Sequence, residues 1–377
     1  MKEPVDTIRK KSMMLKKGDG AVPHNFQAKC LPVLIGSLPL DDHEEAIKLV
    51  LKYTPEIPIW VQLPVFKEEG MIAQFLPGFP SVTIEKDKVF INTADENFDE
   101  NLLKFYEDYM AVIDRETDLD NSRFVLKPDT AGGFFALFDH IHTLSTPLSA
   151  VKGQISGPIT FCTGLKDQNG RAIFYNEQVK DAAVKLLALK AAWQVRRLAT
   201  FGCPVIIFID EPALAGFGSS EFISITREEV TMCLTEVIEA IHGEGGLAGI
   251  HVCANTDWSM VLESSVDIVN FDAYSYFDKF ILYPDQIVNF FKSGRILAWG
   301  IVPTLNAEDI AKETKDSLLA KWETRSRKIE ELGIARSDIL AQSLITPSCG
   351  AGSMRVDHAI KVLRLTSEIS ENLRKQI

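Results

Sequence analysis

The 377-residue sequence contains no apolar run close to the ~20 residues that a transmembrane helix requires. It also lacks a surplus of positive charge, because 40 Lys and Arg stand against 52 Asp and Glu, a net charge of −12. Nucleic acids and anionic membranes are bound through basic patches, so this balance argues against both as partners. No apolar segment of signal-peptide type follows the charged start of the chain. We therefore expect an acidic, globular, cytoplasmic protein.

Cysteine is scarce and scattered. Six cysteines occur, at positions 30, 162, 203, 233, 253 and 349, and no two of them form a C-x-x-C pair. In a long chain without an export signal, this usage indicates free thiols or metal ligands rather than disulfides. The first four have no histidine or carboxylate at ligand spacing, so we interpret them as core thiols.

One histidine and two cysteines form a candidate metal site. Residues 247–252 are an apolar run entered through glycines, which predicts a buried strand, and alternate residues of a strand share a face. His251 and Cys253 would therefore point to the same side at the strand end. Cys349 follows another apolar run and precedes Gly350. Imidazole nitrogen and thiolate sulfur suit tetrahedral Zn²⁺, although a packed histidine with inert core thiols is the plainer alternative.

The order of apolar segments predicts the fold class. Eight of them predict strands, at residues 31–37, 57–63, 151–157, 204–210, 247–252, 267–272, 295–301 and 339–345. Most are separated by segments of helical periodicity, which is typical of an α/β protein of the (β/α)8 TIM-barrel class. Residues 1–30 would be an N-terminal extension, and residues 31–377 one catalytic barrel. Alternating sequence at about 77–94 predicts a β-hairpin inserted after the second strand.

Polar residues follow several of these strands. Barrel enzymes carry their chemistry at the carboxyl ends of the strands, so we expect these residues to gather around one mouth. They are Gly36, Ser37, Gln62, Ser156, Gly157, Asp210, Glu211, His251, Cys253, Asp272 and Cys349.

Several strand ends, taken in order, resemble a known family. They are Ile35-Gly36-Ser37, Gly157-Pro158-Ile159-Thr160, Ile209-Asp210-Glu211-Pro212-Ala213-Leu214, His251-Val252-Cys253 and Pro347-Ser348-Cys349-Gly350. Together they resemble the catalytic C-terminal barrel of cobalamin-independent methionine synthase, within the wider uroporphyrinogen decarboxylase-like superfamily. The resemblance runs from about residue 31 to the end of the chain.

The resemblance implies a zinc-dependent methyltransferase that moves a methyl group to a thiol, in methionine biosynthesis. His251, Cys253 and Cys349 would hold the Zn²⁺. Asp272 stands where the family has a fourth ligand, a glutamate that is one methylene longer. Asp210 would bind the amino group of an amino-acid thiol, which favours homocysteine over coenzyme M. The backbone of residues 35–37 (Ile35, Gly36 and Ser37) would bind the carboxylate of the thiol.

The sequence departs from the family on the side of the methyl donor. Full-length members have a second, N-terminal barrel that helps to hold a polyglutamyl folate, and their folate-associated tryptophan is absent from residues 160–165. The glutamate expected after the second strand is also missing, and Gln62 and Glu68 are imperfect substitutes for it. A single barrel of this kind is similar to the short "core" methionine synthases, which implies a methylated corrinoid protein as donor and partner.

Two other functions remain open from the sequence. A metal-free enzyme of the uroporphyrinogen decarboxylase type would share the fold, but it would need arginines near its N-terminus, where Arg9 is the only one. A non-catalytic protein that stores zinc or senses a thiol would also use His251, Cys253 and Cys349. Methyl release from methylcobalamin, driven by homocysteine, would distinguish the enzyme from the second alternative.

Overall fold

The computed structural model describes residues 26–86, 88–141, 144, 147–217 and 224–377. Most of the predicted N-terminal extension (residues 1–25) and Asp87, at the turn of the predicted hairpin, lie outside the described residues. Residues 26–30 lead into the first strand, and Ala28 and Cys30 are buried there. The division into an extension and one barrel domain stays a prediction.

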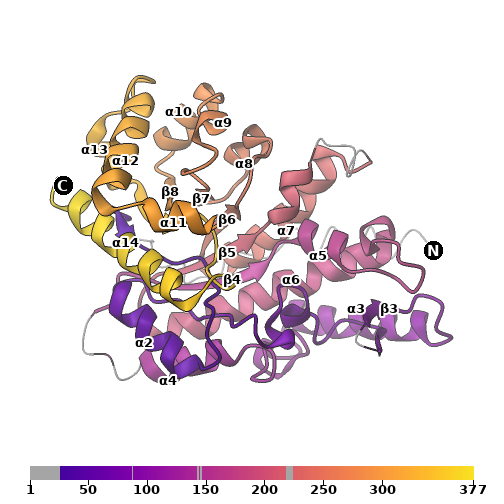
Figure 1. Ribbon diagram of the computed structural model, residues 1–377. Coiled ribbons are helices and arrows are strands. Elements are labelled where there is room, and N and C mark those ends of the chain that lie inside the picture. Colours follow the sequence, from indigo (N-terminus) through magenta and orange to yellow (C-terminus); the bar gives the residue numbers. More distant parts are fainter. Residues whose placement is uncertain (1–25, 87, 142–143, 145–146, 218–223) are drawn as a thin grey trace.

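A curled sheet of seven parallel strands forms the centre of the molecule (Figure 1). The order of the strands is β1-β9-β8-β7-β6-β5-β4. Their bounds are β1 (Leu31–Pro32), β4 (Val151–Ser156), β5 (Val205–Asp210), β6 (Leu247–Val252), β7 (Ile268–Phe271), β8 (Ile296–Val302) and β9 (Ser343–Pro347). This arrangement confirms the predicted barrel-like α/β fold.

The segment at residues 57–63 joins the two edges of the sheet. Its Ile59 forms a parallel bridge to Lys152 of β4, and its Gln62 forms one to Ser37, just beyond β1. The Gln62 backbone N–H donates to the Gly36 carbonyl at 3.2 Å. The segment therefore takes the place of the predicted second strand, although its pairing is limited to isolated bridges.

Helices lie outside the strands in Figure 1. They are α2 (His43–Tyr53), α3 (Phe98–Ile113), α4 (Gly132–Ile141), α5 (Pro158–Gly164), α6 (Glu177–Leu198), α7 (Arg227–Gly243), α8 (Trp258–Glu263), α9 (Phe277–Phe280), α10 (Pro284–Lys292), α11 (Ala307–Lys312), α12 (Lys315–Glu330), α13 (Arg336–Ala341) and α14 (Val356–Arg374). The start of α7 is fixed by a capping box, in which the Thr226 hydroxyl accepts from the Glu229 N–H and the Glu229 carboxylate accepts from the Thr226 N–H.

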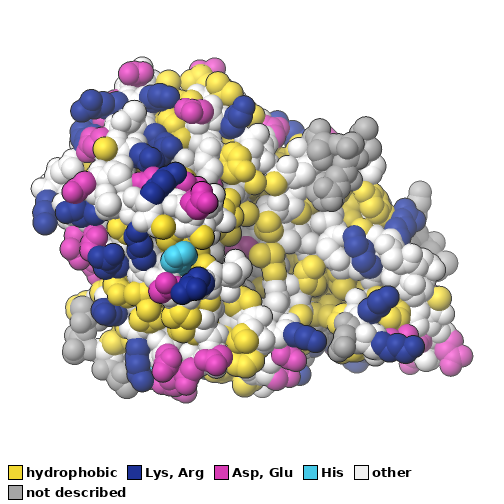
Figure 2. All heavy atoms as spheres, viewed as in Figure 1, with side chains coloured by type: hydrophobic (Ala, Val, Ile, Leu, Met, Phe, Trp, Pro, Cys, Tyr) yellow, Lys and Arg dark blue, Asp and Glu magenta, His cyan; other side chains and the backbone are white. Residues whose placement is uncertain are grey.

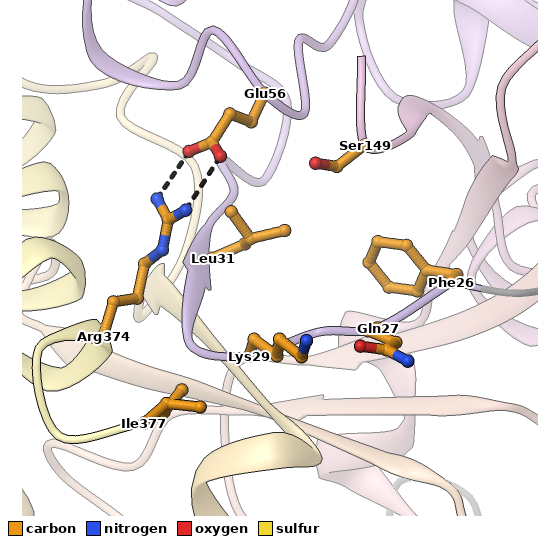
Figure 3. A pocket seen from close by; sticks show the side chains of 8 residues that line it. All are labelled: Phe26, Gln27, Lys29, Leu31, Glu56, Ser149, Arg374 and Ile377. Carbon is orange, nitrogen blue, oxygen red and sulfur yellow. Dashed lines mark hydrogen bonds and ion pairs between the residues drawn. The ribbon is translucent and has the colours of Figure 1, made fainter. Parts of the chain in front are cut away.

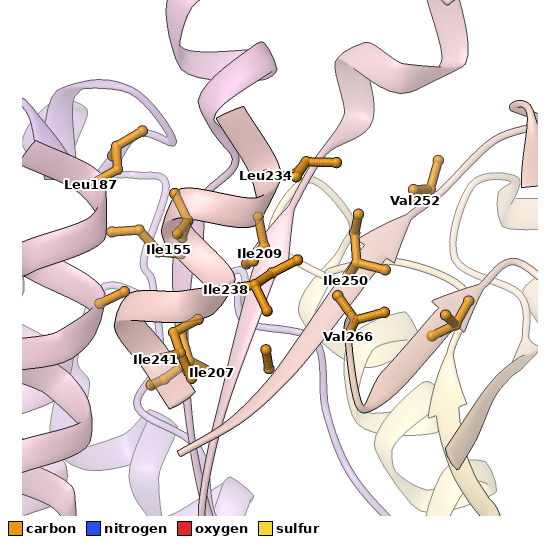
Figure 4. Packing of buried hydrophobic residues seen from close by; sticks show 14 of the residues in the cluster. Ile155, Leu187, Ile207, Ile209, Leu234, Ile238, Ile241, Ile250, Val252 and Val266 are labelled. Atoms are coloured by element: carbon orange, nitrogen blue, oxygen red, sulfur yellow. The ribbon is translucent and has the colours of Figure 1, made fainter. Parts of the chain in front are cut away.

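Two hydrophobic clusters use the two faces of each strand. Ile207 and Ile209 of β5 point outward and pack with the side chains of α7, as Figure 4 shows. Ile206 and Phe208 point the opposite way and belong to the second cluster. Asp210 continues this inward-facing set at the carboxyl end of the strand. Because strands buried on both faces need apolar residues at nearly every position, β5 reads as a continuous β-branched run.

The hairpin and the last strand test two finer predictions. Strands β2 (Val82–Glu85) and β3 (Lys88–Ile91) pair antiparallel, which confirms the hairpin within residues 77–94. The prediction for residues 339–345 is wrong in its first part, because residues 339–341 end helix α13 and the strand begins at Ser343. The buried residues at the end of α13 and those of β9 follow one another in the sequence as one apolar run. Hydrophobic periodicity could not show where the helix ends and the strand begins.

No described helix combines the length and the apolar composition needed to cross a membrane.

A buried lysine on α6 predicts a pH-dependent stability. Lys190 is fully buried, and its ammonium donates to the Val125 carbonyl at 2.9 Å. Burial, together with the nearby charge of Lys127, lowers the pKa of Lys190 to about 7. The unfolded chain therefore binds one proton more between about pH 7 and about pH 10.5, and wild-type stability rises with pH through this window.

Replacing Lys190 by methionine should raise the free energy of unfolding by about 1–2 kcal/mol at pH 7, with the gain vanishing towards pH 10. Urea unfolding at several pH values measures this difference. Lys185 is the matched control on the same helix, because it is buried but lies 2.9 Å from Asp181 and 3.1 Å from Glu236. Lys185→Met should destabilise the protein, and a loss of stability in both variants would contradict the prediction.

Candidate metal centre

His251, Cys253 and Cys349 come together at the carboxyl ends of the strands. His251 lies near the end of β6, Cys253 directly follows that strand, and Cys349 follows β9. One ligand atom from each residue lies within 4.8 Å of the others. The predicted triad is therefore brought together by the fold, although 96 residues separate Cys253 from Cys349 in the sequence.

The donor set fits zinc. Bonds of about 2.3 Å to sulfur and about 2.0–2.1 Å to nitrogen place the ligand atoms of a tetrahedral zinc about 3.5–3.8 Å apart. The three side chains bring their ligand atoms within 4.8 Å of one another, so small adjustments would suffice. The His251 Nε2 atom is buried and has no hydrogen-bond partner among the described residues. Both cysteines are partly exposed, so an ion held here would face the mouth of the barrel. An orphaned imidazole nitrogen beside two thiols is what a metal ligand set requires.

The two thiols influence each other strongly. Their mutual contact lowers the pKa of Cys253 to about 4, with help from His251, and raises the pKa of Cys349. Burial lowers the pKa of His251, but its contact with Cys253 and the charge of Asp210 outweigh that effect and raise it. The cluster thus holds protons that a metal ion would displace on binding.

The loop that carries Cys349 is anchored on the end of the neighbouring strand, β1. The Ser37 carbonyl accepts from the Ala351 N–H at 2.9 Å, and the Ser37 hydroxyl accepts from the Gly352 N–H at 3.2 Å. A Cβ atom at Gly350 would lie 2.3 Å from the Ser37 hydroxyl, so only glycine permits this approach. Ser37 therefore fixes the course of the chain around Cys349.

Asp210 is an unpaired buried carboxylate next to the triad. It is the parallel partner of His251 in the register between β5 and β6. The residue is 6% exposed, and its Oδ1 atom has no hydrogen-bond partner in the part of the chain that the structure describes. Burial raises the pKa of Asp210 to about 6, against the opposing charges of His251 and Lys152. A carboxylate placed in this way is suited to bind a cationic group of a ligand.

Residues 35–37 offer backbone donors at the same mouth. Within the described residues, the N–H groups of Gly36 and Ser37 form no hydrogen bond. Gln62 packs against them, since a Cβ atom at Gly36 would lie 2.7 Å from the Gln62 Oε1 atom. The Gln62 amide donates in turn to Gln74 at 2.6 Å. Gln62 is therefore held in place beside these donors.

Asp272 follows β7 but lies outside the cluster of three. Its Oδ1 atom accepts from the Ser275 N–H at 2.7 Å, while its buried Oδ2 atom has no partner. Burial raises the pKa of Asp272 to about 6. One oxygen is thus free to accept a bond, and ligation of zinc by Asp272 stays a prediction.

Glu211 has a structural role. It is fully buried, and its carboxylate accepts from the N–H groups of Ile159 (2.8 Å) and Thr160 (2.9 Å) at the start of α5. Gly157 makes room for it, because a Cβ atom there would lie 2.0 Å from the carboxyl carbon. Negative charge at a helix start is favourable, so Glu211 fixes α5 beside the mouth.

Sequence reasoning missed two inward-facing polar residues. Lys152 of β4 is fully buried, its ammonium contacts the Ile35 carbonyl, and burial lowers its pKa to about 8. Asn270 of β7 is fully buried and contacts the ring of His251. A polar residue on the same face of a buried strand as a suspected residue is the signal that could have found both. Asn270 lies two positions before Asp272, and Lys152 lies four positions before Ser156.

Two cavities lie at opposite ends of the barrel. One, of about 730 Å³, lies beyond the carboxyl ends of β4 and β5 and is lined by Met71, Ile72, Thr160, Thr163, Gly164, Lys166, Arg171, Ala172, Tyr175, Pro212, Ala213, Ala215 and Gly216. The other, of about 600 Å³, lies beside the start of β1, and Figure 3 shows the ion pair of Glu56 and Arg374 on its wall. It contains none of the candidate residues.

Known proteins resemble this chain in fold but not in sequence. No protein-family model matches the sequence, and no curated protein is significantly similar to it. A B12-independent methionine synthase from Shewanella sp. W3-18-1, in complex with selenomethionine, has a TM-score of 0.50 and 15% identity, over 92% of this chain and 98% of that one. A methyltransferase from Methanosarcina mazei has a TM-score of 0.51 and 12% identity, over 92% and 94%. At these identities the likeness shows a shared fold.

Proposed function

We propose that this protein is a zinc-dependent methyltransferase that methylates a thiol, with homocysteine as acceptor and a methylated corrinoid protein as donor. The observation that carries the proposal is the convergence of His251, Cys253 and Cys349 within 4.8 Å at the barrel mouth. The two structures of similar fold, a methionine synthase and a methyltransferase, agree with this chemistry.

The chemical need is a thiolate at neutral pH. A free thiol has a pKa of about 8.5, so it is mostly protonated there and is a poor nucleophile. Zinc at this site would supply the positive charge that favours the thiolate form of the acceptor. Cys253 and Cys349 as thiolates, with a neutral His251, would balance the charge of the ion and leave a position open towards the mouth.

The neighbouring residues would orient an amino-acid thiol. Asp210, with an unpaired oxygen, would bind the ammonium group. The free N–H groups of Gly36 and Ser37 would bind the carboxylate. These contacts hold the two charged ends of homocysteine so that its sulfur reaches the triad, and holding a nucleophile in place lowers the entropy cost of the reaction. Coenzyme M carries a sulfonate and no ammonium, so it would leave Asp210 unpaired.

The donor side of the site favours a large, exposed donor. Small residues, Thr163 and Gly164, line the cavity where the related enzymes have a folate-associated tryptophan. Figure 2 shows a hollow at the centre of the face on which Figure 1 labels β4, β5 and β6, with hydrophobic side chains around it. An open apolar mouth suits a corrin ring presented by another protein.

The proposed step is a nucleophilic displacement at the methyl carbon. The acceptor sulfur forms the new S–CH3 bond while the Co–C bond of the corrinoid breaks. The electron pair of the Co–C bond stays on cobalt, and the proton of the thiol passes to solvent. Sulfur and cobalt must lie in line on opposite sides of the methyl group, which requires the donor to approach from the mouth.

A donor experiment tests the proposal. With zinc-loaded protein and homocysteine, we expect methylcobalamin to support methionine formation and methyltetrahydrofolate not to support it; mass spectrometry of the products measures both. Equal turnover with the folate would overturn the corrinoid assignment and leave the thiol chemistry in place. Zinc binding without methyl release from methylcobalamin would indicate the non-catalytic alternative. Protein that does not bind added zinc would indicate a metal-free enzyme of the uroporphyrinogen decarboxylase type.

A further inference from the structure

Asn270 occupies a position in the barrel that links the metal centre to two further strands. It is the parallel partner of His251 across β6 and β7, and of Ala298 across β7 and β8. Its side chain is 0% exposed. Its oxygen faces the Nδ1 atom of His251 in a short hydrogen bond. The amide is thus buried in the barrel interior, in contact with a candidate ligand.

The orientation of the Asn270 amide is fixed by its other end. The Nδ2 atom donates to the Ala298 carbonyl at 3.0 Å and to the Thr346 hydroxyl oxygen at 2.8 Å. Thr346 donates its own hydrogen to the Pro347 carbonyl at 2.8 Å, so its oxygen can only accept from Asn270. Turning the amide over would place its oxygen against two acceptors and lose two buried hydrogen bonds, which disfavours that orientation.

A fixed amide oxygen decides which nitrogen of His251 carries the hydrogen. A neutral imidazole has one N–H and one acceptor nitrogen, and either nitrogen can carry the hydrogen. The Asn270 oxygen can only accept, so it retains the hydrogen on Nδ1. The free electron pair is then on Nε2, the buried atom that has no partner within the described residues. That atom is the one available to the metal.

We propose that Asn270, held by Ala298 and Thr346, is a positioning residue that selects the Nε2 atom of His251 as the metal ligand. The inference rests on the proposed function, since it concerns the same site. Ligand histidines are commonly oriented through their second nitrogen, and loss of the partner typically lowers metal affinity about 10- to 100-fold. Because the partner here is a neutral amide, it orients the ring without adding negative charge to the two thiolates.

A direct measurement requires no variant. Long-range ¹H–¹⁵N correlation spectra of zinc-loaded protein, labelled at histidine nitrogen, report which ring nitrogen carries hydrogen. We expect one histidine to change on zinc addition, with hydrogen on Nδ1 and metal on Nε2. Coordination through Nδ1 would overturn the inference and leave the proposed function standing. Wild-type protein that binds no zinc would overturn both.

Variants test how much Asn270 contributes to zinc affinity. Asn270→Leu keeps the size of the side chain but removes the acceptor, so zinc affinity in a chelator competition should fall about 10- to 100-fold. Asn372→Leu on α14, where the amide donates to the Glu368 carbonyl at 2.8 Å, is the matched control and should bind zinc as the wild type does.

Thr346→Val is the second variant, should Asn270→Leu fail to fold. It removes one of the two anchors and leaves the Asn270 oxygen in place, so it should lower zinc affinity by a smaller factor of about 3 to 10. Unchanged affinity in both folded variants would overturn the role of Asn270, whatever the outcome of the donor experiment.

Discussion

Replacing Cys253 and Cys349 together by serine is expected to remove zinc from the protein and to lower methyl transfer about 1,000-fold or more. Two of the three converging ligand atoms are lost in this variant, and a neutral hydroxyl is a much weaker ligand for zinc than a thiolate. Elemental analysis should find close to one zinc per wild-type chain and almost none in the variant. Turnover with methylcobalamin and homocysteine measures the activity.

Cys203→Ser supplies the control for this double variant. Cys203 is a partly exposed free thiol that precedes β5, away from the strand ends that carry the triad. Its replacement should leave both zinc content and turnover unchanged. Should the double variant retain zinc, the metal would be bound elsewhere, and the assignment of these three ligands would be wrong. A wild type that contains no zinc and takes none up would remove the basis of the proposed chemistry.

Replacing Asp210 by asparagine should weaken homocysteine binding about 100-fold while leaving the zinc content unchanged. The side chain keeps its shape but loses the negative charge that would meet the ammonium group. Asp210 is buried and has one unpaired oxygen, so solvent cannot take over its role. The Michaelis constant for homocysteine, measured with saturating methylcobalamin, reports the effect.

A second thiol makes this prediction specific. The compound 4-mercaptobutyrate has the carboxylate and the sulfur of homocysteine but no amino group. Wild type should bind it poorly, and Asp210→Asn should not weaken its binding further. If the variant lost affinity equally for both thiols, Asp210 would act on the metal centre or on folding, and the ammonium would have to bind elsewhere.

The strands could be predicted because their signal is local. Buried parallel strands are short apolar runs that end in polar or glycine residues, and β5 and β6 lie within one residue of their predicted bounds. The predicted strand bounds were wrong where a helix and a strand are adjacent in the sequence or where strand pairing is irregular. Helix α13 and strand β9 formed a single apolar run, and residues 57–63 pair too irregularly to form a full strand although they close the barrel.

Part of the candidate site could also be predicted from the sequence. His251 and Cys253 share a strand face, so their proximity follows from the alternation of side chains. Cys349 could be proposed because it also follows an apolar run, and the resemblance to a family supported this, but no spacing rule relates residues 96 positions apart. Lys152 and Asn270 were missed, since each looks like an ordinary polar residue until the register of the neighbouring strands is known.

The sequence by itself determined the class of fold and identified the candidate ligand side chains, because hydrophobic periodicity and ligand chemistry are properties of short segments. Only the tertiary structure decided which atoms of those side chains are available. Asn270 reaches His251 because β6, β7, β8 and β9 lie next to one another in a fixed register. That register results from packing the whole barrel interior at once, so no single segment of the sequence could specify it.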